Sequence, residues 1–396
     1  MRIGMLMCAH VVGTVNVVSV LAMAPVIQRE LGLSATHVGF LMAGYYSGQA
    51  IWSLPAGAFV DRIGVGLSLV GAMVGISIGT SVVCLSSNLP FLLLGMLIMG
   101  SGYSFTNPST AKGVFDWFPP YRRATAMGAK QTGVPLGGVI AAGLGALTVL
   151  ADWRVLLGCV VVITFLFGLG CLLLVTPRQK KPTPCMNPLS GLCELFRDAN
   201  YGRFVLANFL YNFGQANFFG FLTLFVREAA RGSQEFAALC LGVAQATSAG
   251  ARFGWGAVSD TLFRGCRKEL VAGIGIASVL LLALMPLTAG WAGAMLMLVV
   301  AGLGITVASY AGLMQTMSVE AVGPRFTGSA VGYNGIGTHM GAIVGPPIFG
   351  AIVDATGGYA GGWLITAGVM AFGVLLLVFG FRPGGWGKAA GCVKPL

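Results

Sequence analysis

The sequence has 396 residues, of which 56% are hydrophobic and only 9% are charged, a balance far from that of soluble globular proteins. Apolar runs of about 20 residues, long enough to cross a hydrocarbon layer roughly 30 Å thick, recur along nearly the whole chain. This pattern excludes a soluble enzyme or binding domain and indicates a polytopic protein of the lipid bilayer. The formal charge of +11 is explained below by membrane topology, so nucleic acid is not an expected partner.

Twelve apolar segments are predicted to be transmembrane helices, and the expected fold class is therefore all-α. In chain order they cover residues 4–28, 36–60, 67–87, 90–116, 124–149, 154–176, 203–227, 235–258, 269–288, 291–315, 326–352 and 358–381. The first segment ends in Ala22-Met23-Ala24, which resembles a signal-peptidase site. Pro25 follows it, and the internal repeat described below requires this helix, so we expect it to be retained.

The distribution of Lys and Arg predicts the orientation, because cytoplasmic loops keep the positive charge. With both termini in the cytoplasm, sixteen basic residues fall in cytoplasmic segments and four fall outside, namely Arg29, Arg154, Arg227 and Arg231. We therefore expect a multi-pass plasma-membrane protein, in the inner membrane of a bacterium. We also expect a functional monomer.

The chain divides into two similar halves. A polar, basic and proline-containing stretch separates the first six segments from the last six, which predicts an N-terminal half at 1–176, a cytoplasmic linker at 177–202 and a C-terminal half at 203–396. Local patterns return across this linker: "RATAMG" at 123–128 returns as "RFTGSAVG" at 325–332. Six is an even number of crossings, so the halves form a parallel repeat related by a pseudo-two-fold axis along the membrane normal.

A charged loop motif also occurs once in each half. The first copy, "GAFVDRIG" after the second segment, supplies Gly57, Asp61, Arg62 and Gly64. The second copy, after the eighth segment, supplies Gly256, Asp260, Gly265, Arg267 and Lys268. Twelve segments with this motif at both places resemble the major facilitator superfamily over nearly the whole chain.

The resemblance implies that the two loop motifs act as a cytoplasmic latch that stabilises one conformational state. The copies depart from the family pattern, because Val65 and Gly66 replace its basic pair and Thr261 replaces its arginine. A further stretch, "AKGVFDWFPPYRRATAMG" at 111–128, is similar to the bacterial organic-anion carriers of this superfamily.

Glycine and proline recur in the fifth and eleventh segments, where they favour bending and close helix packing. The residues concerned are Pro135, Gly137, Gly138, Gly345, Pro346 and Pro347. Similar patterns in the fifth segment are associated with efflux antiporters, which supports a second functional hypothesis.

Polar residues at helical spacing are candidates for substrate contacts, although the same residues also serve as hydrogen-bonding links between helices. The candidates are His10, Tyr45, Tyr46, Gln49, Tyr103, Asn107, Asn208, Tyr211, Asn212, Gln215, Tyr333, Asn334 and His339. No metal-ligand spacing, nucleophile–base pair or phosphate-binding loop is present, so we expect neither a cofactor nor an enzymatic activity.

Three basic residues, Lys112, Lys130 and Arg252, lie inside predicted segments, and none of the twelve acidic residues lies at mid-membrane. Lys130 is seven residues beyond Arg123, about 10 Å along its helix from the cytoplasmic end. Its ammonium group either reaches the lipid headgroups or faces a cavity between the halves. Polar neighbours favour the cavity, and we expect Lys130 to bind an anionic substrate, with Lys112 and Arg252 contributing.

The functional hypothesis is a secondary transporter, a symporter or an antiporter, for a small organic anion working by alternating access. The alternatives are a drug or metabolite efflux antiporter of the same superfamily and a non-transporting membrane receptor or scaffold. Cations without neighbouring acids favour the anion carrier, because a carrier of cations usually needs a carboxylate at mid-membrane.

Overall fold

The computed structural model describes residues 2–53, 55–175, 194–263, 266–291, 293–322 and 327–382. All regular secondary structure in this part of the chain is helical. Gly265 of the second motif and residues 177–193 of the expected linker lie outside the described residues.

The N-terminal half contains six transmembrane segments, several of which consist of two consecutive helices. Their helices are α1 (Arg2–Ala22) with α2 (Ala24–Leu31), α3 (Ala35–Trp52) with α4 (Pro55–Ile63), α5 (Val65–Leu85), α6 (Leu89–Tyr103) with α7 (Thr106–Trp117), α8 (Pro120–Gln131) with α9 (Gly133–Ala146) and η1 (Leu147–Val149), and α10 (Trp153–Gly170) with η2 (Cys171–Leu174).

The C-terminal half repeats this plan with six more segments. Their helices are α12 (Ala199–Glu228), α13 (Gln234–Thr261), α14 (Arg267–Leu284) with η3 (Met285–Gly290), α15 (Gly293–Ile305) with α16 (Ala311–Glu320), α17 (Thr327–Thr356), and α18 (Ala360–Leu375) with η5 (Leu376–Gly380).

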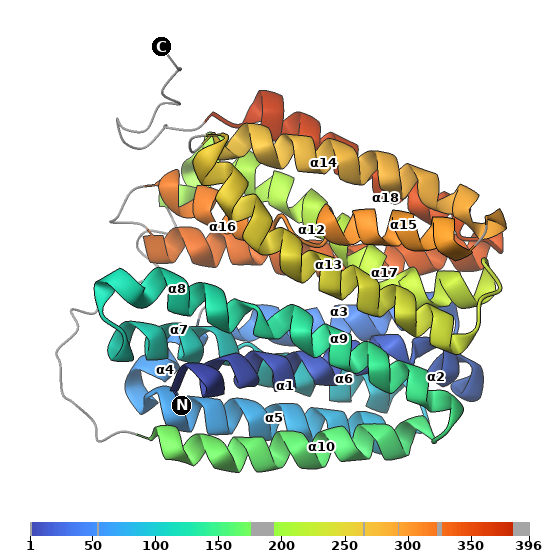
Figure 1. Ribbon diagram of the computed structural model, residues 1–396, viewed down its shortest axis with the longest axis horizontal. Helices are drawn as coiled ribbons and strands as arrows, with labels where there is room; N and C mark the ends of the chain where they lie inside the picture. The colour runs from blue at the N-terminus through green and yellow to red at the C-terminus, as the bar shows by residue number, and fades with distance from the viewer. Residues whose placement is uncertain are drawn as a thin grey trace.

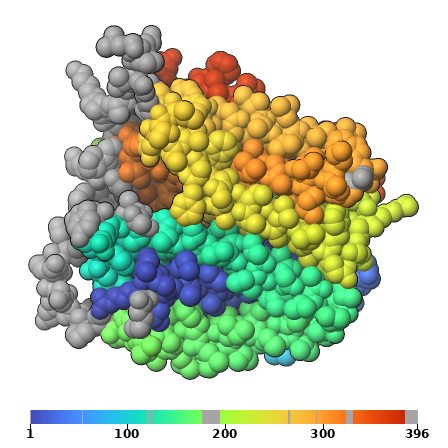
Figure 2. All heavy atoms as spheres, viewed as in Figure 1, coloured from blue at the N-terminus to red at the C-terminus, as the bar shows by residue number. Residues whose placement is uncertain are grey.

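The two halves lie side by side with their helices roughly parallel to one common direction (Figure 1). The N-terminal half forms the lower bundle in this view and the C-terminal half the upper bundle, and in the space-filling view they meet along one continuous boundary (Figure 2). We call the end where α1 and α12 begin the linker end, and the other the opposite end. The segment that ends at Leu174 and the helix α12 that begins at Ala199 are joined at the linker end (Figure 1).

Eight helical segments in the described ranges are apolar and long enough to cross a membrane by length and composition alone. The other four expected segments correspond to α3–α4, α12, α13 and α15–α16. Three of them, α3–α4, α12 and α13, are more polar, whereas α15 is apolar but short. The three polar segments carry many of the side chains that face other helices at the boundary of the halves. A helix that borders such an interface need not be as apolar as one surrounded by lipid.

Helix starts follow local sequence signals. Ser34 and His37 form a reciprocal capping box at the start of α3, where the Ser34 hydroxyl accepts from the His37 N–H and the His37 ring accepts from the Ser34 N–H. The Ser233 hydroxyl accepts from the third backbone N–H of α13 in the same way. The second transmembrane segment of each half therefore has a defined start at the opposite end.

The two glycine–proline segments differ in shape. The fifth segment is interrupted at Thr132, just before Pro135, and continues as α9. By contrast, α17 is a single helix that includes Pro346 and Pro347. Proline therefore coincides with an interruption in one half and with a continuous helix in the other.

Glycines bring the halves into close backbone contact. A Cβ atom on Gly39 of α3 would lie 2.3 Å from the carbonyl oxygen of Pro346 in α17. A Cβ atom on Gly138 of α9 would lie 2.4 Å from the side chain of Gln245 in α13. Only glycine permits the backbone contact at Gly39, whereas a larger residue at position 138 would require the Gln245 side chain to move.

Hydrogen bonds join the halves at the opposite end. The Asp354 carboxylate at the end of α17 accepts from the backbone N–H groups of Ala35 and Thr36, each at 2.9 Å, and from the Thr36 hydroxyl. Asp354 therefore interacts with the N-terminus of α3, where a negative charge is stabilised by the helix dipole.

Gln234, the first residue of α13, occupies the pseudo-symmetric position in the C-terminal half and joins it to the N-terminal half. Its amide group donates to the Ala22 carbonyl at 3.0 Å and to the Gly145 carbonyl at 3.2 Å. The Thr223 hydroxyl of α12 donates to the Leu21 carbonyl at 2.9 Å. In this structure the halves are thus tied together at the opposite end.

A further contact at the opposite end holds the N-terminal half together. Glu30 of α2 accepts from the Arg154 guanidinium and, at 2.6 Å, from the Trp153 ring N–H. The hydrogen bond from Arg154, followed by that from Trp153, lowers the pKa of the Glu30 carboxyl. Because the folded-state pKa is depressed, this contact stabilises the fold at neutral pH and is lost as the pH falls through that pKa.

Candidate substrate site between the two halves

The first loop motif forms an ion pair at the linker end. Lys112 Nζ of α7 lies 3.1 Å from Asp61 Oδ1 of α4 and 3.7 Å from Asp116 Oδ2. Gly64, which follows the motif, has φ of +85° and turns the chain into α5. Arg62 is exposed at the same turn.

The second motif copy forms a comparable network. Arg267 lies 3.1 Å from Asp260 through Nη2 and 2.7 Å from Glu320 through Nη1. Lys268 Nζ donates to two backbone carbonyls at the end of the last segment, each at 2.8 Å. Open space surrounds the first glycines of both copies, Gly57 and Gly256. Within the described residues, each ion pair of the motifs joins helices of the same half.

An aromatic group lies at the middle of the boundary between the halves. In α3, the rings of Tyr45 and Tyr46 have centroids 5.3 Å apart, and the Tyr103 ring at the end of α6 lies 6.1 Å from that of Tyr45. Tyr46 reaches the other half, where the His339 ring of α17 lies 6.3 Å away. Gln49, one turn after Tyr45, is half-buried.

Arg252 of α13 adds a positive charge to this group. Its Nη2 donates to the Ala308 carbonyl at 3.2 Å, while its Nε is buried without a hydrogen-bond partner. The guanidinium is close enough to Tyr103 and Tyr310 to interact with them electrostatically. All twelve acidic residues of the chain lie in the described ranges, and none of them forms an ion pair with Arg252.

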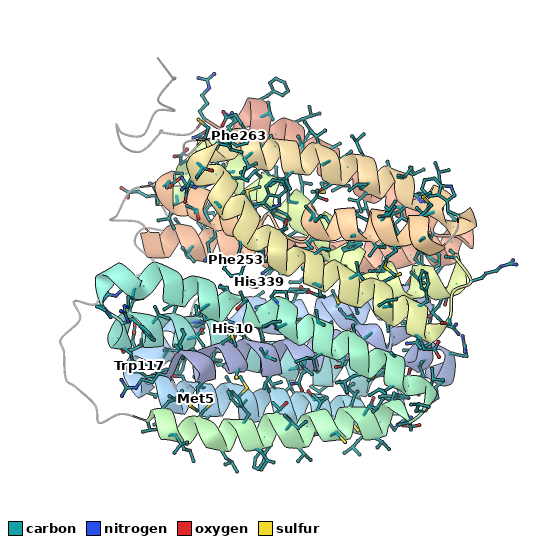
Figure 3. The ribbon with its side chains drawn as sticks, in the orientation of Figure 1. Met5, His10, Trp117, Phe253, Phe263 and His339 are labelled. Atoms are coloured by element: carbon teal, nitrogen blue, oxygen red, sulfur yellow. The ribbon has the colours of Figure 1, made fainter. Side chains whose placement is uncertain are left out.

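The central cluster, as we call it, is defined as Tyr46, Tyr103, Arg252, Tyr310 and His339. Both halves contribute to it: two residues come from the N-terminal half and three from the C-terminal half. In the side-chain view, Phe253 and His339 lie near the boundary of the two bundles, whereas His10 lies within the lower bundle (Figure 3). The cluster can offer hydrogen-bond donors and one full positive charge to a ligand.

The polar stripe of α12 packs against other helices of its own half. Asn208 Nδ2 donates to Asn334 Oδ1 at 2.9 Å and to the Thr338 hydroxyl at 2.8 Å. Asn212 Nδ2 donates to the Tyr310 hydroxyl at 2.9 Å. Asn212 therefore supports the central cluster by fixing the position of the Tyr310 ring.

The remaining candidates of this half also pack against its own helices, and the Tyr211 ring lies 5.0 Å from the Tyr310 ring of the central cluster. Gln215 donates to a backbone carbonyl of the tenth segment at 3.0 Å, and Tyr211 donates to a backbone carbonyl of α14 at 3.1 Å. Tyr333 packs near the linker end, with its ring centroid 4.2 Å from that of Phe196.

Lys130 is fully buried within the N-terminal half. Its ammonium group donates to Asn107 Oδ1 at 2.8 Å and to the Thr110 hydroxyl at 3.1 Å, both on α7. His10 of α1 is hydrogen-bonded to the same hydroxyl through Nε2 at 2.9 Å. The lysine side chain thus points into the bundle rather than along it towards the headgroups.

The three basic residues expected to act together occupy different places. Arg252 lies in the central cluster, Lys130 lies behind Asn107, and Lys112 lies in the motif ion pair at the linker end. Two participants were not singled out from the sequence, namely Tyr310 and Thr110. Tyr310 follows a stretch with serine and threonine in an otherwise apolar segment, and Thr110 is one turn from Thr106. These two patterns indicate polar helix faces but do not specify a role for either residue.

The comparisons with known proteins agree with this architecture. A family model described as Major Facilitator Superfamily matches residues 5–318 and 204–390. The chain is 28% identical over 384 residues to a hexuronate transporter of Bacillus subtilis (strain 168), a match covering 91% of this chain and 89% of the relative.

Solved structures show the same fold at lower identity. A bacterial homologue of the human lysosomal transporter Spinster, in an inward-facing and occupied conformation, matches with a TM-score of 0.73 and 20% identity over 95% of both chains. The nucleoside transporter NupG matches with a TM-score of 0.80 and 16% identity over 96% of this chain and all of its own. From the family match over nearly its whole length, the chain belongs to the Major Facilitator Superfamily.

Proposed function

We propose that this protein is a secondary transporter that carries a small organic anion between the two halves by alternating access. The observation that supports the anion most directly is Arg252, a guanidinium at the boundary of the halves without an acidic partner among the described residues. An unpaired charge away from bulk water is unfavourable, and a carboxylate ligand would neutralise it. Guanidinium groups also match the planar geometry of carboxylates.

The rest of the central cluster favours the same ligand class. Tyr46, Tyr103 and Tyr310 offer hydroxyl donors, and His339 has a buried ring nitrogen, Nδ1, without a hydrogen-bond partner. The hexuronate named in the Bacillus subtilis relative is a carboxylate with several hydroxyl groups, and this is the substrate class that we propose here. A positively charged ligand would meet the Arg252 charge with nothing to offset it.

Binding between the halves fits alternating access. In this state the halves are joined at the opposite end by Asp354 and Gln234. A ligand that contacts both halves can bias which end is closed, because its affinity differs between the two states. Since one chain supplies both sides of the cluster, we propose that the monomer is the functional unit.

We further propose that the linker end faces the cytoplasm. Most Lys and Arg residues between the segments belong to that end, as the positive-inside rule requires. An impermeant thiol reagent added to intact cells should leave a cysteine introduced at Arg197 unlabelled. Ready labelling at that position would reverse the orientation.

Substitution of Arg252 tests the proposed function. In the purified full-length protein, Arg252→Gln should weaken binding of a labelled hexuronate about tenfold or more, because a charge-assisted hydrogen bond is lost. Arg252→Lys should retain part of the affinity, since it keeps the charge without the planar fork. Equilibrium binding and thermal unfolding measured on the same samples separate lost affinity from lost folding.

The matched control is Arg29→Gln, which removes one positive charge from an exposed side chain at the opposite end. This variant should bind like the parent protein. Unchanged affinity in Arg252→Gln, or an equal loss in both variants, would contradict the assignment of Arg252 as the anion contact.

A further inference from the structure

Lys130 has no place in the direct contacts described above, yet it is an ammonium group with none of its surface exposed. Among the described residues its partners are two neutral oxygens, Asn107 Oδ1 and Thr110 Oγ1. A buried lysine without a carboxylate is costly, so its retention requires a reason beyond packing.

The hydroxyl of Thr110 has two backbone carbonyls within hydrogen-bonding distance, that of Thr106 at 2.8 Å and that of Asn107 at 3.1 Å. Its oxygen accepts from Lys130, which can only donate, and it is hydrogen-bonded to His10 Nε2. Thr110, which is itself hydrogen-bonded to His10, therefore holds the ammonium group beside Asn107.

The orientation of the Asn107 side-chain amide also follows from the donors and acceptors around it. An asparagine amide has a donor end and an acceptor end, and a neutral polar neighbour could meet either one. An ammonium group cannot accept, so it selects the orientation in which the Asn107 oxygen faces Lys130. The Nδ2 group, with its two N–H donors, must then face away from Lys130, and it has no hydrogen-bond partner in the described part of the chain.

Asn107 is exposed and lies one turn after Tyr103 of the central cluster. On the neighbouring α8, Gly128 faces Phe253 of α13, since a Cβ atom at that glycine would lie 3.8 Å from the Phe253 ring. α8, which carries Lys130, thus approaches α13, which carries Arg252. Asn107 is one turn from Tyr103, the cluster residue of this half that interacts with Arg252, so its free amide donors belong to the N-terminal side of the boundary.

We propose that Lys130 is a positioning residue that locks the Asn107 amide with its N–H donors towards the substrate. The site then offers donors from both halves, Asn107 Nδ2 from one and Arg252 from the other, and selects ligands rich in acceptor oxygens, such as hydroxy carboxylates. This inference rests on the proposed anion function and adds to it how the N-terminal half recognises the ligand. Lys130 acts through Asn107 and makes no contact with the ligand itself.

A double-mutant cycle tests this inference in the purified full-length protein with a labelled hexuronate as the probe. Lys130→Gln replaces a donor-only group with one that can also accept, and Asn107→Ala removes the amide; each should raise the dissociation constant about tenfold. The double variant should be no weaker than Asn107→Ala alone, because the lysine acts only through that amide. Lys130→Arg, which remains donor-only, should recover most of the affinity.

Additive losses, near a hundredfold in the double variant, would overturn the inference by showing that Lys130 acts on the ligand independently. An unaltered dissociation constant in Asn107→Ala would overturn it as well. If Lys130→Gln does not fold, Asn107→Asp decides: it gives the ammonium a carboxylate partner, so it should fold and yet lose anion affinity, and retained affinity would contradict the inference. Failure of the anion function itself is distinguishable, because then the parent protein binds no hexuronate and Arg252→Gln changes nothing.

Discussion

At the scale of single residues, the three intramembrane cations show what the sequence could and could not predict. Their presence and the absence of mid-membrane acids were evident from the segment boundaries alone. The roles of the three cations could not be predicted, because the depth of a residue along a helix does not show which other residue its side chain contacts. Lys112 pairs with Asp61, Lys130 donates to Asn107, and Arg252 interacts electrostatically with Tyr103 of the other half.

The Lys112–Asp61 pair gives a prediction at this scale. Both side chains are partly exposed, at 30% and 64%, so the pair should contribute less than about 1 kcal/mol to stability. Asp61→Asn should therefore unfold close to the parent temperature while exchanging substrate more slowly, because the latch implied by the family motif favours one conformational state. The rate of counterflow at saturating substrate is the measurement.

Lys112→Met is the matched variant, since it removes the same ion pair from the other side. The two substitutions should slow exchange to a similar extent, and their combination should add little. Parent-like exchange rates in both variants would leave Asp61 and Lys112 as surface residues without a latch role.

At the scale of elements, pairing across the boundary could be anticipated only in part. Glycine and proline in the fifth and eleventh segments indicated close packing, and the structure places Gly138 and Pro346 at contacts with the other half. Their partner helices, α13 and α3, were not predicted, since no local pattern specifies which helix of the opposite half is met. The interruption at Thr132 agrees with the bending expected there, because Pro135 has no N–H to donate to the Gln131 carbonyl.

The contact between α3 and α17 gives a prediction about conformational balance. Asp354→Asn weakens the charge-assisted contact with the start of α3, and Gly39→Ala inserts a methyl group against the Pro346 carbonyl. Both changes destabilise the state closed at the opposite end, so both should increase the population that is open there, by about 1–3 kcal/mol in relative free energy.

Distances between spin labels at Arg29 and Glu235, exposed residues of different halves at that end, report the shift. Both variants should lengthen the mean distance. Gly71→Ala is the control, because a Cβ atom there meets nothing within 4 Å, and it should leave the distance unchanged. Identical distance distributions in the parent, Asp354→Asn and Gly39→Ala proteins would refute the role of this contact in holding the end closed.

At the scale of the whole molecule, the all-helical fold in two six-segment halves was predictable. Segment length, the polar linker and the repeated motif each indicated it independently, and the family match and solved structures confirm it. The site was less predictable, because it forms where α3, α6, α13 and α17 meet and these helices are far apart in sequence. Polar stripes showed which helices face other helices, but not which of their residues reach the boundary of the halves.

The arrangement of the two halves favours one class of substrate. Two homologous halves close around a cluster with one unpaired cation, so exchange of an anion across the membrane should require nothing beyond this chain and a bilayer. Neutral hexoses lack the carboxylate that Arg252 needs, and cationic dyes would meet its charge directly.

Counterflow in proteoliposomes is therefore the most direct test of the central claim. Vesicles containing the purified protein and loaded with unlabelled hexuronate should transiently accumulate external labelled hexuronate, whereas vesicles loaded with a neutral hexose should not. Arg252→Gln should abolish the accumulation and Arg29→Gln should preserve it. Exchange of a cationic dye in place of the anion, or equal hexuronate accumulation with Arg252→Gln, would contradict the proposal that this protein carries an organic anion bound by Arg252.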